Sequence, residues 1–311
     1  MTYTFLLPAF KATYFREALE SIKNQTYRDF KVIVSDDCSP EGTALRQIYD
    51  EVADPRFTFR RNAENMGSNS LVSHWNILVD LCDTDYLIMA SDDDVYEPTF
   101  LEEINRLVEK YPACDLFRGR LKSIDEEGNL LLNDCQTPEF MDQAHFFYKY
   151  YARDMLTCEA NYVYKTSVLK QKGGYVDFPK AWFTDDATHI MMAENGCAIS
   201  EGIVFGFRQS MISISNRWKD ADDARQKVEA SLAYNRWITD KAKNIVSPSE
   251  KAMTRLALSY CKERIIRNAQ NNIQNCSRKD FFRLSDRCQK EMGLSKPVLL
   301  YNWWRSHKMF F

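Results

Sequence analysis

The segment YLIMASDDDVYEP, residues 86–98, joins an apolar run to three consecutive aspartates and closes on a proline. The apolar run has the character of a buried β-strand, and a proline after the acidic loop suits the first turn of a helix. Adjacent carboxylates repel one another, so three of them at the end of a buried strand indicate a positive charge facing them. We therefore expect a strand, an acidic loop with a functional task and a helix, in that order.

Strand and helix patterns alternate four times along the first part of the chain. Runs typical of strands, each followed by apolar side chains at helical spacing, lie at residues 3–10, 30–39, 56–62 and 85–94. The alternation predicts βαβ units. Three of the runs are continuously apolar, the first with a break at Pro8, which is typical of parallel strands covered on both faces. We predict an α/β fold, Rossmann-like, with a mostly parallel sheet and flanking helices.

The pattern changes after Pro112, and the last third of the chain reads as helical. We place a domain boundary between residues 217 and 218, so that residues 1–217 form the α/β domain and 218–311 a helical region. Further expectations are a hairpin turning at Glu127–Gly128, an aromatic-rich helix in residues 138–155, a helix capped by Thr184, a strand pair in residues 197–209 and a break at Pro248.

Composition and charge set the broad class. The chain has 311 residues, 45% hydrophobic and 27% charged, without an apolar run long enough to span a bilayer or a signal-peptide pattern. Its nine cysteines form no CxxC pair, which argues against a zinc site or a disulfide framework and favours a reducing cytoplasm. Residues 1–215 carry 21 Lys and Arg against 34 Asp and Glu, whereas the rest carries 20 against 10. An acidic body with a basic tail indicates two units with different partners.

Three groups of residues follow strands of the predicted sheet. Residues 8–11 follow the first strand, Asp36 and Asp37 the second, and residues 92–94 the fourth. Because open α/β sheets bind ligands beyond the carboxyl ends of their strands, we expect these groups at one anionic edge. A divalent cation, Mg²⁺ or Mn²⁺, with a phosphate-bearing ligand would balance that edge. The alternative is that each acidic group caps a turn or a helix.

A further acidic pair, Asp185–Asp186, stands at the predicted start of a helix. One of the two carboxylates could act as a general base if the helix points at the same edge. The alternative is that the pair complements the helix dipole. His74 and His189 have no metal-ligand spacing, so we interpret both as core or helix-surface residues.

The absence of GxGxxG and GxxxxGK[ST] motifs argues against a dehydrogenase and a P-loop NTPase. The order of the remaining motifs resembles family 2 glycosyltransferases of the GT-A fold over roughly residues 1 to 215. The segments that carry the resemblance are FLLPAFKATYFREALESIKNQTYRDFKVIVSDDCSPEGT, NAENMGSNSLVSHWN, YLIMASDDDVYEPTFLEE, KQKGGYVD and WFTDDATHIM.

The resemblance implies inverting transfer of a sugar from a nucleotide-diphosphate sugar, expected to be a UDP-sugar, in polysaccharide, O-antigen or capsule synthesis. The acceptor would be a saccharide or a lipid-linked saccharide. Asp93, with Asp92, would hold the Mn²⁺ or Mg²⁺ ion, and Asp186 would be the general base, supported by Asp185. The donor-binding residues that the resemblance implies are Pro8, Ala9, Phe10, Asp36, Asp37, Asn65, Gly67, Asp92 and Arg208.

Two departures from the family pattern concern the metal. Counting back from Pro98, the first aspartate of the family's DxD motif falls at Ser91 and the second at Asp93. Ser210 stands where many relatives carry a histidine, although Arg208 is still expected to reach the diphosphate. A nucleotidyltransferase or a non-catalytic nucleotide-sugar-binding protein is the alternative function. The lack of glycine in PAFKATYF argues against the nucleotidyltransferase.

The basic tail contains aromatic residues between its cations, as in LLYNWWRSHKMFF at the end of the chain. Trp303, Trp304, Phe310 and Phe311 beside Arg305 and Lys308 suit a membrane interface with anionic lipid. We therefore expect a cytoplasmic protein whose tail either docks on the inner face of the membrane, packs on the α/β domain or forms a homo-oligomer. No nucleic-acid-binding module is recognisable, so nucleic acid is not an expected partner.

Overall fold

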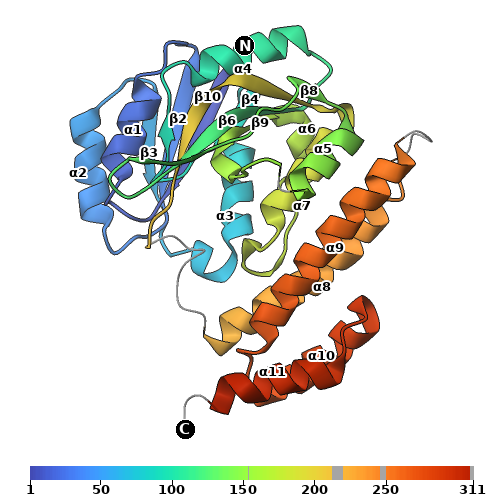
Figure 1. Ribbon diagram of the computed structural model, residues 1–311. Coiled ribbons are helices and arrows are strands. Elements are labelled where there is room, and N and C mark those ends of the chain that lie inside the picture. The colour runs from blue at the N-terminus through green and yellow to red at the C-terminus, as the bar shows by residue number, and fades with distance from the viewer. Residues whose placement is uncertain (153, 212–219, 246–249, 309–311) are drawn as a thin grey trace.

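The computed structural model describes residues 1–152, 154–211, 220–245 and 250–308, in which a central mixed sheet is flanked by helices (Figure 1). The strands are β1 (Tyr3–Ala9), β2 (Phe30–Asp36), β3 (Phe57–Arg61), β4 (Tyr86–Met89), β5 (Val95–Tyr96), β6 (Leu116–Ile124), β7 (Leu130–Asn133), β8 (Phe140–Met141), β9 (Tyr162–Lys165) and β10 (Cys197–Arg208). The α-helices are α1 (Phe15–Lys23), α2 (Gly42–Val52), α3 (Gly67–Leu81), α4 (Phe100–Lys110), α5 (Gln143–Tyr151), α6 (Thr166–Gln171), α7 (Thr184–Met192), α8 (Ala221–Lys241), α9 (Lys251–Ile273), α10 (Arg278–Met292) and α11 (Lys296–Lys308). Three 3₁₀ turns complete the list: η1 (Glu159–Asn161), η2 (Pro179–Ala181) and η3 (Ala193–Asn195).

The sheet is parallel over its N-terminal half, as predicted. Its order is β3-β2-β1-β4-β9-β6-β10-β5, and the pairs among β3, β2, β1 and β4 are all parallel. β9 runs antiparallel to both β4 and β6, whereas β6 and β10 are parallel to each other. The carboxyl ends of β1, β2 and β4 therefore meet at one edge. The predicted break at Pro8 is wrong, because β1 continues through this residue to Ala9 in register with β2.

Alternate residues of the central strands pack on opposite faces of the sheet. In β1, Phe5 and Leu7 join the core under α1, α2 and α4, whereas Leu6 joins the core formed with α3, α5 and α7. β4 divides in the same way, with Ile88 on the first side and Met89 on the second. Burial on both faces explains why these strands read as continuous apolar runs.

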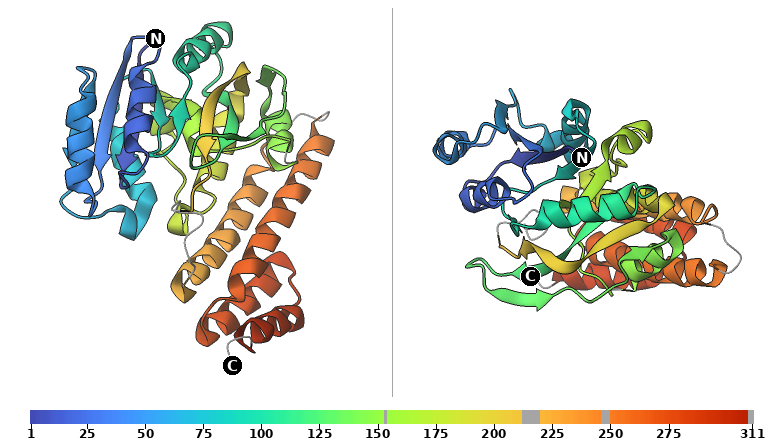
Figure 2. Two further views of the ribbon diagram at one scale, coloured as in Figure 1. Left: turned by 60° about the vertical axis from the view of Figure 1, so that its left-hand side comes forward. Right: turned by 90° about the horizontal axis from the view of Figure 1, so that it is seen from above.

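The C-terminal helices pack on the α/β domain. α8 and α9 lie side by side as a long pair against the part of the molecule that holds α5 and α7, away from α1 and α2 (Figures 1 and 2). Tyr234 of α8 and Ile265 of α9 belong to the same core as α5 and α7, and a second core joins the pair to α10 and α11. The expected boundary at residues 217 and 218 lies outside the described residues, and so does Pro248.

Four local expectations can be compared with the structure. The hairpin is confirmed, since β6 and β7 flank a turn in which Gly128 has a φ of 87°. The strand pair at residues 197–209 is one strand, β10, with irregular register near Ile203, because it follows β6 along its whole length. Thr184 is not a cap but the first residue of α7, after Phe183. All nine cysteines are described, and all are free thiols.

Candidate active site

The loop after β1 is fixed by the acidic loop after β4. One oxygen of Asp92 accepts hydrogen bonds from the backbone N–H groups of Phe10 and Lys11, both at 2.8 Å. The Lys11 ammonium lies 2.6 Å from Asp93 Oδ2 and 3.4 Å from Asp92 Oδ1. Burial alone would lower the pKa of Lys11, but the charges of Asp92 and Asp93 outweigh it and raise the pKa. The positive charge that the acidic loop requires is therefore present in the chain itself.

The third aspartate is buried beneath this loop. Asp94 accepts hydrogen bonds from the Ser91 hydroxyl and from the Arg208 backbone N–H at the end of β10. Burial, and then the charge of Asp93, raises the pKa of Asp94 to about 7. Asp92 and Asp94 are buried, whereas the Asp93 side chain is partly exposed. Asp93 is therefore the carboxylate best placed to meet a ligand.

Arg208 lies under the acidic loop and binds it to neighbouring segments. Its Nε donates to the Asp93 carbonyl at 2.9 Å, and its Nη1 donates to the Glu126 carbonyl at 2.9 Å. Its Nη2 pairs with Glu17 on α1, and its guanidinium lies 4.5 Å from the centre of the Tyr14 ring. The side chain is almost fully buried by these contacts. A direct contact with a diphosphate, expected from the sequence, would require some of these bonds to break.

The carboxylates after β2 are held by the protein as well. Asp36 accepts a bond from the Ser39 backbone N–H at 2.8 Å and pairs with Arg61. Asp37 accepts the backbone N–H groups of Met66 and Gly67, at 2.9 and 2.7 Å, and so caps the start of α3. A Cβ at Gly67 would lie 2.9 Å from Asp37 Oδ2, so this approach requires glycine. The structure thus brings Asp37 and Gly67 together, in the capping role that was the alternative interpretation.

His74 and Asn62 lie behind Asp37. The Asn62 amide donates to Asp37 Oδ1 at 2.8 Å, and His74 Nδ1 lies 3.7 Å from Asp37 Oδ2. Burial lowers the pKa of His74, which favours the neutral imidazole. His74 is therefore a core histidine, one of the two interpretations given above.

Strained backbone adjoins both aspartate pairs. Cys38, directly after Asp37, has a φ of 52°, and Lys180, Ala181 and Phe183, just before Asp185, have φ values of 60°, 53° and 71°. A left-handed conformation costs roughly 1–3 kcal/mol for a residue with a side chain, and such residues cluster at ligand sites. Ala53 after α2, away from both pairs, is also left-handed with a φ of 29°, whereas the residues flanking α1 and α4 have ordinary φ values.

Asp186 is paired with an arginine from the C-terminal helices. Arg264 of α9 donates to Asp186 Oδ1 at 2.8 Å and to Oδ2 at 3.3 Å. The Asp186 side chain is 3% exposed and that of Arg264 is 39% exposed. Its neighbour Asp185 is partly buried, and burial followed by the charge of Asp186 raises the pKa of Asp185 to about 6.

Two consecutive residues connect the acidic loop with α7. Cys158 Sγ lies 3.6 Å from Asp94 Oδ2, and Glu159 accepts hydrogen bonds from the hydroxyls of Tyr164 and Tyr175 at 2.7 and 2.5 Å. Glu159 Oε2 is also 3.1 Å from Nε2 of His189, one turn along α7 from the aspartate pair. His189 is buried against the Tyr162 ring, as a core residue. A chain of buried contacts through Cys158, Glu159 and His189 therefore links the loop after β4 to α7.

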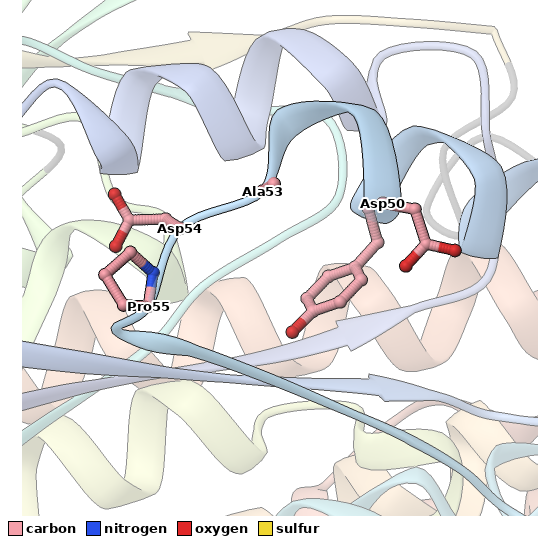
Figure 3. A pocket seen from close by; sticks show the side chains of 5 residues that line it. Asp50, Ala53, Asp54 and Pro55 are labelled. Carbon is pink, nitrogen blue, oxygen red and sulfur yellow. The ribbon is translucent and has the colours of Figure 1, made fainter.

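A hollow of about 330 Å³ lies elsewhere, at the C-terminal end of α2. Its lining comprises Tyr49, Asp50, Ala53, Asp54 and Pro55 (Figure 3). It precedes β3 and so lies at the amino edge of the parallel strands, where open α/β sheets do not bind their ligands. Asp54 is paired with Arg56, and Asp50 with Arg46. This hollow is not part of the candidate site.

The mostly parallel α/β sheet with acidic loops at its carboxyl edge is the arrangement expected of a GT-A glycosyltransferase. The family model described as Glycosyl transferase family 2 matches residues 4–170, more than half of the chain. The chain belongs to this family.

Among curated relatives, an uncharacterised glycosyltransferase of Methanocaldococcus jannaschii is 29% identical over 163 residues, which is 51% of this chain and 53% of that protein. Chondroitin synthase of Escherichia coli is 30% identical over 135 residues, 42% of this chain and 19% of that protein. The chain thus matches no more than about half the length of these relatives.

Two kinds of solved structure share the fold. S. aureus TarS 1–349 in complex with UDP-GlcNAc has a TM-score of 0.64 at 14% identity, covering 97% of this chain and 87% of that one. The mannosyltransferase PcManGT of Pyrobaculum calidifontis, in complex with GDP-Man and Mn²⁺, has a TM-score of 0.57 at 13% identity, covering 96% and 78%. Because the matches cover nearly the whole chain, the helical C-terminal region is part of the shared arrangement.

Three site residues were missed by sequence reasoning. Lys11 could have been found, because it is the cation of the loop that was expected to face the acidic residues. Glu159 and Arg264 gave no signal, since neither belongs to a motif and Arg264 lies 78 residues from its partner. Pairings of this kind depend on how α9 packs, which periodicity does not specify.

Proposed function

We propose that this chain is an inverting glycosyltransferase that moves a sugar from a nucleotide-diphosphate sugar to an acceptor hydroxyl. The observation that carries the proposal is that the loops after β1, β2 and β4 meet at one edge of the sheet, which buried contacts link to α7. In the proposal, the donor site is lined by residues 8–10, Asp36, Asp37, Asn65 and Gly67. The UDP-GlcNAc and GDP-Man complexes of the structural neighbours support a nucleotide-sugar donor, and we propose a UDP-sugar.

We propose that the acidic loop also takes a divalent cation. Asp92 Oδ1 and Asp93 Oδ2 already share one cation, the Lys11 ammonium, and hard carboxylate oxygens suit Mn²⁺ or Mg²⁺. Among the described residues no group of three or more His, Cys, Asp or Glu side chains could hold a metal, so the donor phosphates would have to complete its coordination. When bound, such an ion would stabilise the charge of the leaving diphosphate. We propose that Lys11 then turns to the same phosphates.

The aspartate pair of α7 supplies the base in this proposal. Inversion by direct displacement requires one group to take the proton of the acceptor hydroxyl, and we assign this role to Asp186, with Asp185 beside it. Arg264 holds both oxygens of the Asp186 carboxylate in place.

The test is a panel of UDP-glucose, UDP-GlcNAc and GDP-mannose, each with Mn²⁺ and with EDTA. Thermal stabilisation reports donor binding, and release of the nucleoside diphosphate reports turnover. We expect Asp93→Ala to lose the Mn²⁺-dependent response and Asp186→Asn to keep donor binding but lose transfer. The exposed Asp29→Ala is the control.

If the intact protein neither binds nor turns over any of these donors, the proposal fails. Binding without turnover would instead indicate a non-catalytic nucleotide-sugar-binding protein. If Asp186→Asn transfers sugar normally, Asp186 is not the general base, and Asp185 is the next candidate.

The names of two relatives support a role in polysaccharide synthesis. One is chondroitin synthase, and the other is a putative colanic acid biosynthesis glycosyl transferase of Escherichia coli, 31% identical over 84 residues, 27% of this chain and 29% of that protein. We propose a saccharide, free or linked to a lipid, as the acceptor.

We also propose that α11 contacts the anionic membrane surface. No helix among the described residues is long and apolar enough to cross a membrane. Trp303 is a packing residue, since it donates to the Cys276 carbonyl and lies against Phe281, but Tyr301 and Trp304 are exposed. Phe310 and Phe311 lie outside the described residues. Deletion of residues 296–311 should abolish flotation with phosphatidylglycerol liposomes, and unchanged flotation would refute the contact.

A further inference from the structure

A groove of about 250 Å³ lies between α5 and α9. It is lined by Tyr151, Ala152, Tyr260, Glu263, Arg264 and Arg267. The groove therefore joins the aromatic-rich helix of the α/β domain to a helix of the C-terminal region, which lie next to each other in space (Figure 1).

Arg264 connects the groove to the proposed base. Arg264 is both a lining residue and the partner of Asp186, and its guanidinium lies 5.7 Å from the centre of the Tyr151 ring and 5.8 Å from that of Phe183. The Asp186 carboxylate itself is nearly inaccessible, so Arg264 is the member of the pair that a ligand in the groove would meet.

The lining has the chemistry that a polyhydroxylated ligand requires. Tyr260 is 37% exposed and packs beside Tyr148, with ring centres 6.2 Å apart, so it offers an amphipathic face to the groove. Glu263 and Arg267, which pair with each other at 2.6 Å, provide an acceptor and donors at the exposed rim. The charges of this pair cancel, which favours a neutral polar ligand over a strongly charged one.

We infer that this groove is the acceptor subsite and that it takes the terminal sugar of a saccharide acceptor. The inference rests on the proposed function. The bound sugar accepts hydrogen bonds from Arg264, which then moves off Asp186 and uncovers the base. The acceptor oxygen forms a bond to the anomeric carbon of the donor, the bond from that carbon to the diphosphate oxygen breaks with its electron pair, and the hydroxyl proton passes to Asp186.

The experiment uses Tyr260→Ala and Arg267→Ala, two exposed changes in the groove. Phe282→Ala, an exposed aromatic on α10, and Arg255→Ala, an exposed position on α9 outside the groove lining, are the matched controls. The acceptor probes are p-nitrophenyl β-glycosides of glucose, galactose, mannose and N-acetylglucosamine. Their binding is measured by saturation-transfer NMR, and nucleoside diphosphate release is measured with and without them.

We expect the two groove variants to raise the KM for the glycoside by about tenfold, the effect of losing roughly 1.4 kcal/mol of contact. Both control variants should keep the KM of the intact protein. If the intact protein binds none of the glycosides, or if groove and control variants behave alike while donor hydrolysis persists, the inference is overturned and the proposed function stands. If the intact protein uses no donor at all, both are overturned.

Discussion

Replacing Arg264 by glutamine should destabilise the protein, because it leaves a buried carboxylate without its partner. Asp186 is 3% exposed and receives two hydrogen bonds from Arg264. Removing one partner of a fully buried ion pair costs about 3–5 kcal/mol. Arg264 is 39% exposed, so water offsets part of this cost, and we expect a loss of about 2 kcal/mol.

The loss can be converted into a melting temperature. An unfolding entropy of about 2.1 cal/mol/K per residue gives roughly 0.65 kcal/mol/K for this chain, so a loss of 2 kcal/mol lowers Tm by about 3 °C. Differential scanning calorimetry on Arg264→Gln measures the shift. Arg255→Gln, at an exposed position of the same helix, should leave Tm unchanged.

A double-mutant cycle tests whether the loss comes from the pair. Once Asp186→Asn has removed the buried charge, Arg264→Gln should cost much less, with a coupling free energy of about 1–2 kcal/mol. Free energies of unfolding that add to within about 0.5 kcal/mol would refute the reasoning, because the two side chains would then be energetically independent.

Three further predictions concern the acidic residues. Lys11→Met removes the cation between Asp92 and Asp93. Calorimetry should show that the variant binds UDP more weakly in EDTA, and that Mn²⁺ increases its affinity for UDP more than it does in the intact protein. An equal increase in affinity would contradict this prediction. Asp92→Ala removes the oxygen that accepts both backbone bonds from the loop after β1 and should cost about 1–3 kcal/mol in urea unfolding, whereas Glu20→Ala at an exposed position should cost nothing measurable. The pKa values of Asp185 and Asp94 are raised to about 6 and about 7, so the folded state keeps protons that the unfolded state releases above its ordinary pKa near 3.8. Their contribution to stability is therefore lost as pH rises from about 4 to about 7, and Asp185→Asn should flatten that part of the Tm profile; an unchanged slope would show that Asp185 does not titrate there.

The parallel half of the sheet could be predicted because its strands are buried on both faces. A strand of this kind is apolar at most of its positions, so β1, β2 and β4 could be recognised in the sequence. The single strand β10 was less legible, because its polar central residues at the register shifts near Ile203 resemble a turn. Threonine commonly caps helices, so Thr184 was predicted as the cap. The left-handed residue Phe183 takes the cap position instead, and Thr184 is the first residue of α7.

The acidic clusters show which part of a site periodicity and motifs can reveal. Parallel strands all end at the same edge of the sheet. Because Asp37 and Asp93 each follow a parallel strand, the sequence predicted that both lie at that edge. What each carboxylate contacts was not predictable. Asp37 caps α3, Asp94 lies beneath the loop, and Asp93 holds Lys11, and these differences depend on side-chain positions a few ångströms apart.

The positions of Lys11 and Arg264 suggest a common organisation of the proposed site. The acidic loop after β4 is paired with a cation from the loop after β1, and the aspartate pair of α7 with one from the C-terminal helix α9. Both cations are partly exposed and end long flexible side chains, so a charged or polar ligand can compete for them at lower cost than for Arg208, which is buried. On this view the donor phosphates would compete for Lys11 and the acceptor for Arg264. Each substrate would then uncover the carboxylate that the reaction needs, which ties the C-terminal helices to the chemistry of the sheet edge.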